Sequence, residues 1–156
     1  MSESATAPLS LRDARRDEVP AIVAMLADDI LGGAREKAGD LPPYFAAFDA
    51  IAHDPNNRLL VANVDGALSG CLQLTFIPGL SRGGAWRAQI ESVRIAASAR
   101  GGGFGRRMIE AAIDLARARG CTLIQLTTDK ARADALRFYE NLGFAATHEG
   151  MKLMLD

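Results

Sequence analysis

The sequence predicts one mixed α/β domain that spans residues 1–156. Its length is that of a single ordinary globular domain. Segments in which apolar and polar residues alternate, as in strands, are interleaved with segments in which apolar residues recur at helical spacing. Apolar residues make up 49% of the chain and charged residues 24%, a composition that excludes a disordered or collagen-like chain.

Charge and composition also restrict the partners. The formal net charge is −1, so no basic excess indicates a nucleic-acid ligand. No apolar run approaches the roughly 18 residues of a membrane span, and the opening MSESATAPLS lacks the features of a secretory signal. Cys71 and Cys121 are the only cysteines, which is typical of a reducing compartment. We expect a cytoplasmic protein with no membrane or nucleic-acid partner.

The charges are unevenly distributed along the chain. Residues 1–55 carry five bases and ten acids, whereas residues 56–156 carry thirteen bases and nine acids. This division favours a protein that holds a cationic ligand beside an anionic one. Ordinary patchiness of surface charge is the alternative.

The first third of the chain predicts a strand and two helices. Residues 9–11 alternate as in a short strand. Acidic residues before Pro20 mark a helix start, and apolar residues then follow at helical spacing until Gly32. A second helix is expected after Pro43 and ends near Pro55. The apolar positions of these helices are Val19, Ile22, Val23, Leu26, Ile30, Phe45, Phe48 and Ile51.

Three strands are expected next. Residues 58–64 and 67–77 are β-like and flank Asp65-Gly66, a hairpin turn signal. A further strand covers residues 86–95. Beyond a glycine cluster, a long helix ends at Gly120.

The last part of the chain predicts two strands and a helix. Residues 122–128 (TLIQLTT) form the first strand, and a short helix before Gly143 carries apolar residues at helical spacing. Residues 151–155 (MKLML) alternate as in a final strand. The apolar residues of the helix are Leu136, Phe138, Tyr139 and Leu142.

The glycine cluster is the first feature that carries chemistry. It reads Arg100-Gly101-Gly102-Gly103-Phe104-Gly105-Arg106 and lies between a predicted strand and a predicted helix. Glycines let main-chain N–H groups approach a ligand, and a helix N-terminus adds unpaired donors, so this segment suits a phosphate. Arg106 and Arg107 oppose the helix dipole unless an anion is bound there. The alternative is a glycine turn with solvated arginines.

The spacing of the glycines narrows the ligand. No Lys-Ser or Lys-Thr follows them, so the segment is not a P-loop. The sixth position of a G-x-G-x-x-G pattern is Arg106 or Met108, which excludes the dinucleotide fingerprint. The segment fits [QR]-x-x-G-x-[GA] from Arg100 to Gly105. Another nucleotide held by the same loop stays open as an alternative.

Three segments, in this order, resemble the GNAT superfamily of N-acetyltransferases: IESVRIAASARGGGFGRRMIEAA, TLIQLTTDK and RFYENLGF. The opening LRDARRDEVPAIVAML is similar too, so the resemblance covers nearly the whole chain. It implies a GNAT-like fold, with a mixed, mostly antiparallel sheet flanked by helices and a strand, glycine loop, helix and strand as the cofactor unit. It also implies acetyl-CoA as co-substrate, no metal, an amine-bearing small molecule or protein as acceptor, and pairing as a homodimer in many members.

The resemblance assigns the cofactor site. The strand would pair with the pantetheine arm through the main chain of Val93 and Ile95, where it separates from its neighbour. Many members have Asn where this chain has Arg132, so the chain departs from the family pattern there. The residues whose main chain would hold the pyrophosphate are Arg100, Gly101, Gly102, Gly103, Phe104, Gly105 and Arg106.

The resemblance also implies a catalytic acid. Acetyl transfer to an amine needs a base that takes the amine proton and an acid that protonates the leaving thiolate. Tyr139 matches the position at which the family commonly has a tyrosine close to the thioester sulfur. A phenol with a pKa of about 10 stays protonated at neutral pH and can donate. An aromatic packing residue in a stripe with Leu136 and Leu142 is the alternative.

Glu91 is the candidate base. Strand alternation puts Glu91, Val93 and Ile95 on one face, so Glu91 would face the cofactor cleft. There it would accept the amine proton, directly or through water, or anchor the acceptor's ammonium group. A carboxylate paired with Arg87 or Arg94 is the alternative.

Other chemistry is disfavoured. Neither cysteine has a histidine nearby in the sequence to activate it, which disfavours an acetyl-cysteine intermediate. His53 and His148 are isolated, without the spacing of a metal site. A non-catalytic acyl-CoA-binding or interaction domain of the same fold is the alternative to an enzyme.

Overall fold

The computed structural model describes residues 9–156. The chain divides into two compact units, one that ends at Gln125 and one that spans Leu126–Asp156, and each is described by itself. The assignment of residues 1–156 to a single domain stays a prediction.

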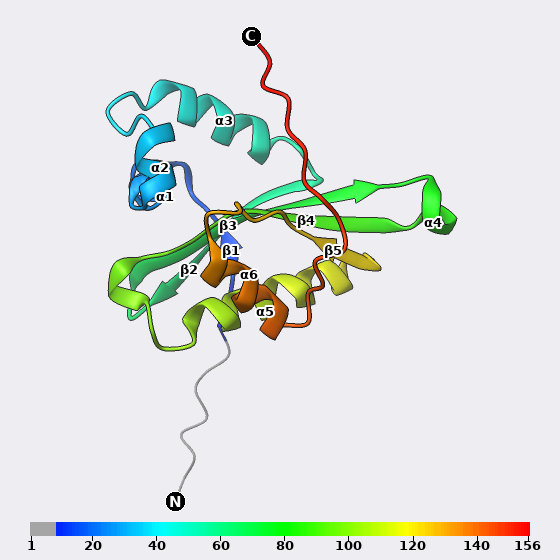
Figure 1. Cartoon of the computed structure of the whole chain (residues 1–156). Coiled ribbons are helices and arrows are strands. Elements are labelled where there is room, and N and C mark those ends of the chain that lie inside the picture. The colour runs from blue at the N-terminus through cyan, green and yellow to red at the C-terminus, as the bar shows by residue number, and fades with distance from the viewer. Residues whose placement is uncertain (1–8) are drawn as a thin grey trace, which may run out of the picture. The chain divides into compact units, whose positions relative to one another are not determined.

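A five-stranded sheet in the order β1-β2-β3-β4-β5 forms the centre of the first unit (Figure 1). Neighbouring strands are antiparallel except β4 and β5, which are parallel. The expected mixed, mostly antiparallel sheet flanked by helices is therefore confirmed. The strands are β1 (Arg12–Asp13), β2 (Asn57–Val64), β3 (Ala67–Pro78), β4 (Trp86–Ile95) and β5 (Leu123–Gln125).

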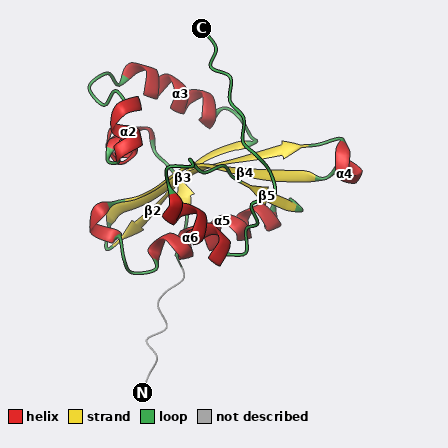
Figure 2. Ribbon diagram, viewed as in Figure 1, coloured by secondary structure: helices red, strands yellow, loops and turns green. Residues whose placement is uncertain are grey.

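Helices cover both faces of this sheet (Figure 2). Helices α1 (Val19–Ala27), α2 (Ile30–Arg35) and α3 (Pro42–Ala52) lie on one face, and α5 (Phe104–Ala118) lies on the other. The four-residue helix α4 (Ser81–Gly84) closes the β3–β4 hairpin. In the described part of the chain, no helix combines the length and the apolar character that a membrane crossing requires.

The core lies on both faces of β2, β3 and β4. On the face of α1, Ile22 packs against Val61 and Cys71. The hairpin that joins β2 and β3 turns at Asp65 and Gly66, whose positive φ angles of 49° and 78° are those of a two-residue hairpin turn. The largest fully buried side chains are Leu60, Leu72, Leu74, Ile90, Met108, Ile109, Val61 and Cys71.

The first predicted helix is broken, so the expectation that glycines end it was wrong. Helix α1 ends at Ala27, and extended Asp29 caps α2 by accepting a hydrogen bond from the Gly32 N–H. A Cβ at Gly32 would lie 1.9 Å from the Leu26 carbonyl oxygen. Gly32 thus allows α2 to approach the end of α1 closely instead of stopping a helix.

Two strands are placed differently from their predictions. The first strand forms at Arg12–Asp13, not at residues 9–11, because Arg12 pairs with Val61 of β2. Of the predicted strand 122–128, only Leu123–Gln125 pairs, and its partner is β4.

The second unit contains helix α6 (Ala133–Asn141), and Gly143 with φ 97° follows its end. The prediction of a strand at residues 151–155 was wrong. Residues 126–156 contain no strand, so this unit offers no sheet edge with which the segment could pair. The large apolar side chains of residues 151–155 are between 84% and 93% exposed: Met151, Leu153, Met154 and Leu155.

Replacement of Gly70 should test the packing of α5 on β3. A Cβ at Gly70 would lie 2.7 Å from Met108 Sδ and 2.9 Å from Phe104 Cε1. We therefore expect Gly70→Ala to lower the free energy of unfolding by about 1–3 kcal/mol in urea titrations. Gly39→Ala is the control, because nothing lies within 4 Å of its Cβ position and its φ is not positive. Equal stability of the two variants would contradict this packing.

Candidate functional site

Strand β4 contains one extra residue where it pairs with β3. Gln73 pairs with Glu91 and Cys71 pairs with Arg94, so two steps along β3 match three along β4. Ser92 lies in this β-bulge with φ 55°, a left-handed conformation that is uncommon for a residue other than glycine. Such outliers concentrate at functional sites.

The bulge decides which side chains share a face. Directly paired residues of two strands project to the same face. Glu91 pairs with Gln73 on the side of α1 and α3, whereas Ile95 pairs with Gly70 on the side of α5. The expectation that strict alternation places Glu91 and Ile95 on one face was therefore wrong, because the extra residue reverses the alternation between them.

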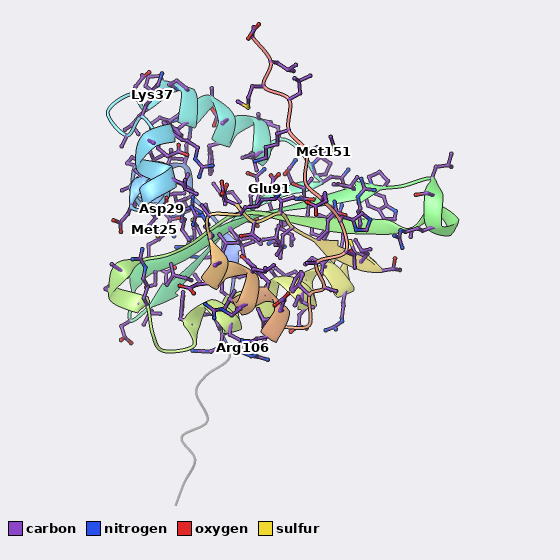
Figure 3. All side chains as sticks on the ribbon, in the orientation of Figure 1. Met25, Asp29, Lys37, Glu91, Arg106 and Met151 are labelled. Atoms are coloured by element: carbon purple, nitrogen blue, oxygen red, sulfur yellow. The ribbon has the colours of Figure 1, made fainter. Side chains whose placement is uncertain are left out.

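Glu91 is an exposed carboxylate on the face of α1 and α3 (Figure 3). Its side chain makes no hydrogen bond or ion pair with any residue that the structure describes. Arg94 instead pairs with Asp29, at 3.1 Å between Nε and Oδ2. The alternative in which the Glu91 carboxylate is paired with Arg87 or Arg94 is therefore wrong.

On the side of β5, the second half of β4 has no strand partner among the described residues, and we call this the open edge. Within the described residues, β5 pairs with β4 only at residues 87–89. The Ala96 N–H donates to the Ser69 carbonyl oxygen of β3 at 2.8 Å, so the main-chain groups of Ile95 point to the opposite, open edge. Those of Val93, two residues earlier, point the same way. The pairing of β4 with β5 thus ends before Val93, and the binding of a pantetheine arm at this edge stays a prediction.

Arginine side chains already contact this open edge. The Val93 carbonyl oxygen accepts a hydrogen bond from Arg94 Nη1 at 2.8 Å, and the Ile95 carbonyl oxygen accepts one from Arg100 Nε at 3.1 Å. Each carbonyl oxygen has a second lone pair, so both can still accept from a ligand.

The glycine loop connects this edge to α5. Gly101 and Gly103 have φ angles of 90° and 74°, and Gly103 is the N-cap of α5 without a side-chain capping bond. Alternating left-handed residues turn successive N–H groups into one concavity that suits an anion. The first-turn N–H groups of a helix lack intrahelical acceptors and add to it.

The arginines of the loop have weak protein partners. Arg100 lies 3.6 Å from Asp28, and Arg106 lies 2.9 Å from Glu110. Both arginine side chains are 54% exposed. Exposed ion pairs of this kind contribute little to stability.

Tyr139 belongs to the second unit, on α6. Its half-buried ring makes edge contacts with Phe138 and Phe144, at centroid distances of 5.1 and 5.6 Å. The first unit brings Glu91, the open edge and the glycine loop together. The role of Tyr139 as the acid stays a prediction.

The cysteines are poor nucleophiles. Burial raises the pKa of the Cys71 thiol to about 12, and it also raises that of Cys121. Thiols that keep their proton at neutral pH do not attack a thioester. Within residues 9–156, His, Cys, Asp and Glu side chains do not gather in the groups of three that would hold a metal ion.

Sequence reasoning missed the bulge at Ser92 and an apolar pocket beneath α1 and α3. The bulge has no sequence signal, because no glycine or proline interrupts β4. The pocket had one, since Ile22, Leu26, Phe48 and Ile51 belong to the predicted apolar stripes. These stripes predict burial but not an incompletely filled space.

Residues 13–144 match the family model described as "Acetyltransferase (GNAT) family". The chain belongs to this family. The resemblance noted in the sequence is thereby confirmed over most of its length.

Acetyltransferases are among its relatives. The chain is 34% identical over 121 residues to glucosamine 6-phosphate N-acetyltransferase of Trypanosoma brucei brucei, covering 78% of this chain and 70% of that protein. It is 31% identical over 139 residues to streptothricin acetyltransferase of Streptomyces lavendulae, covering 87% of this chain but only 62% of that protein.

A solved structure is more similar in sequence. A protein described as a transcriptional regulator from Bacillus halodurans C-125 superposes with a TM-score of 0.89 at 49% identity, covering 94% of this chain and 99% of that one. The GNAT fold is therefore shared across proteins with different descriptions.

Thiol titration should test the burial of Cys71. We expect one thiol per folded chain to react faster than the other with Ellman's reagent at pH 8, because Cys121 is partly exposed whereas Cys71 is buried and has the pKa of about 12. Cys121→Ser should abolish the fast reaction, and both thiols of the parent chain should react after unfolding. A fast reaction that persists in Cys121→Ser would contradict the burial of Cys71.

Proposed function

We propose that this GNAT protein transfers an acetyl group from acetyl-CoA to an amine by direct attack in a ternary complex. The observation that supports this most strongly is the open edge of β4, which runs into a glycine loop at the start of α5. In this proposal, the main chain of Val93 and Ile95 binds the pantetheine arm. Main-chain N–H groups of residues 100–106 bind the pyrophosphate.

The proposed reaction forms one bond and breaks another. The amine nitrogen attacks the thioester carbonyl carbon, and the carbon–sulfur bond of the tetrahedral intermediate then breaks. Glu91 accepts the amine proton, directly or through a water molecule, and Tyr139 donates a proton to the departing sulfur. The products are the acetylated amine and CoA with its thiol protonated, and solvent returns each residue to its starting state.

The environment of Glu91 supports its role. A carboxylate without an ion-pair partner among residues 9–156 is available to a cationic amine, and it can serve as the base or as the anchor of the ammonium group. Hydrogen-bond donors whose positions are fixed by the sheet are suited to stabilising the tetrahedral intermediate. We therefore propose that a main-chain N–H of β4 donates a hydrogen bond to its oxyanion.

Gly103→Glu should abolish binding of CoA. The variant places a carboxylate where the proposal puts phosphates, and it strains a residue with φ 74°. We expect an affinity loss of at least about 100-fold by calorimetry. Gly120→Glu is the matched control, because Gly120 follows the other end of α5 with φ 90° and open space around it. Unaltered affinity in Gly103→Glu would refute the phosphate role of the loop.

Tyr139→Phe should lower kcat and leave the affinity for acetyl-CoA nearly unchanged. Loss of a general acid typically lowers the rate about 100-fold or more, and an interaction made only in the transition state affects kcat but not binding. Phe138→Leu is the control for ring packing, because Phe138 contacts the same ring. Equal rates for Tyr139→Phe and the parent would leave Tyr139 with a packing role only.

A second candidate is an acyl-CoA-binding domain without turnover. The observation that favours it is the description of the 49% identical relative as a transcriptional regulator. Calorimetric binding of acetyl-CoA, with no release of thiol over a panel of amines and peptides, would support this candidate over the enzyme.

A further inference from the structure

An apolar pocket lies between α1, α3 and the face of the sheet that carries Glu91. Its volume is about 140 Å³. Among the described residues that line it, none has a charged side chain. Its walls include Ile22, Leu26, Phe48, Ile51, Cys71 and Gln73.

Two of the polar side chains of these walls, those of Gln73 and Tyr44, are engaged with the protein. Gln73 donates from Nε2 to Asn57 Oδ1 at 3.0 Å, and the Tyr44 hydroxyl donates to Glu36 Oε2 at 2.7 Å. A ligand in the pocket therefore meets mainly hydrocarbon.

Glu91 is adjacent to two residues of the pocket wall, and we call this side of the pocket its rim. Gln73, which is part of the wall, is its direct partner across the strands, and Ser92, the next residue, also lines the pocket. Paired residues have Cβ atoms about 5 Å apart. Arg94 pairs with Asp29, and in the part of the chain that the structure describes the carboxylate of Glu91 has no ion-pair partner beside this apolar space.

We infer that the pocket binds an alkyl or aryl group that carries a primary amine, with the ammonium group held at Glu91. The inference rests on the proposed function, which makes this amine the acetyl acceptor. An apolar cavity of about 150 Å³ is known to hold a benzene molecule, so a phenyl ring fits the space. Charge complementarity places the cationic end at the rim and leaves the ring inside.

The same walls disfavour a phosphorylated sugar. Hydroxyl and phosphate groups in this pocket would lose water without gaining donors or cations in return. The acceptor class thus differs from the substrate that gives the trypanosomal relative its name.

Binding without acetyl-CoA tests the pocket separately from catalysis. We expect 2-phenylethylamine to shift the methyl resonances of Ile22, Leu26 and Ile51 in a saturable way. Its dissociation constant from this titration should be at least tenfold lower than that of ethylamine. No saturable shift, or equal binding of the two amines, overturns the inference even if acetyl-CoA binds and other amines are acetylated. In that case the proposed function still stands.

Acetyl transfer then tests the acceptor. We expect kcat/KM for 2-phenylethylamine to exceed that for ethylamine by at least about 100-fold, because each missing apolar group in such a pocket lowers it tenfold or more. Glucosamine 6-phosphate acetylated as efficiently as 2-phenylethylamine overturns the inference. If 2-phenylethylamine binds but no amine is acetylated, both its role as acceptor and the proposed function are overturned. The inference that the pocket binds such an amine would still stand.

A pair of tryptophan variants tests where the amine binds. Ala46 and Ala47 are both exposed on α3, but only Ala47 is among the residues that line the pocket. Ala47→Trp should weaken the binding of 2-phenylethylamine at least tenfold and leave the binding of acetyl-CoA intact. Ala46→Trp should change the binding of neither compound. An equal effect of both tryptophans, or of neither, contradicts the assigned pocket.

Glu91→Gln tests the charge. The parent should bind 2-phenylethylamine about tenfold more tightly than neutral 2-phenylethanol, and this ratio should fall to about one in Glu91→Gln. Binding of 2-phenylethanol serves as the control, because it uses the pocket alone. A ratio that is unchanged in the variant overturns the role of Glu91 as the anchor.

Discussion

The register between β3 and β4, with one extra residue at Ser92, is the constraint on which the rest of the site depends. Upstream of the bulge, Glu91 projects toward α1 and α3 beside Gln73. Downstream, Ile95 has turned to the face of α5. The strained φ of Ser92 is maintained because ladder pairs on both sides of it fix the two halves of the strand.

This register gives the two halves of β4 different tasks. The upstream half presents a side chain, the Glu91 carboxylate, to an apolar pocket. The downstream half presents main-chain groups to an edge that β5 leaves open and continues directly into the glycine loop. In the proposed function, an amine and a thioester meet where these halves join. Both sides of the reaction would then be positioned by one strand, without a mobile element between them.

The sequence predicted those parts that depend on local chemistry. The Asp65-Gly66 turn specifies its hairpin through two positive φ angles, and the long helix that begins at Phe104 is specified by its apolar stripe and the glycines before it. The bulge could not be predicted, because it is set by pairing with β3 and by no residue type in β4. The segment 151–155 alternates like a strand, but alternation gives no strand without a partner edge. Among the site residues, the sequence pattern alone indicated the glycine loop. The face on which Glu91 lies follows only from the pairing of β3 with β4.

The walls of the apolar pocket contain two ionisable groups that keep their protons. Burial raises the pKa of the Cys71 thiol to about 12. The Tyr44 phenol accepts a hydrogen bond from the Lys37 N–H, which lowers its pKa, but the Glu36 carboxylate and burial outweigh this effect and raise it. These two groups of the lining therefore stay uncharged near neutral pH. A proton exchanged with the buffer when an amine enters therefore does not come from Cys71 or Tyr44, and calorimetry in buffers of different ionisation enthalpy can count such protons.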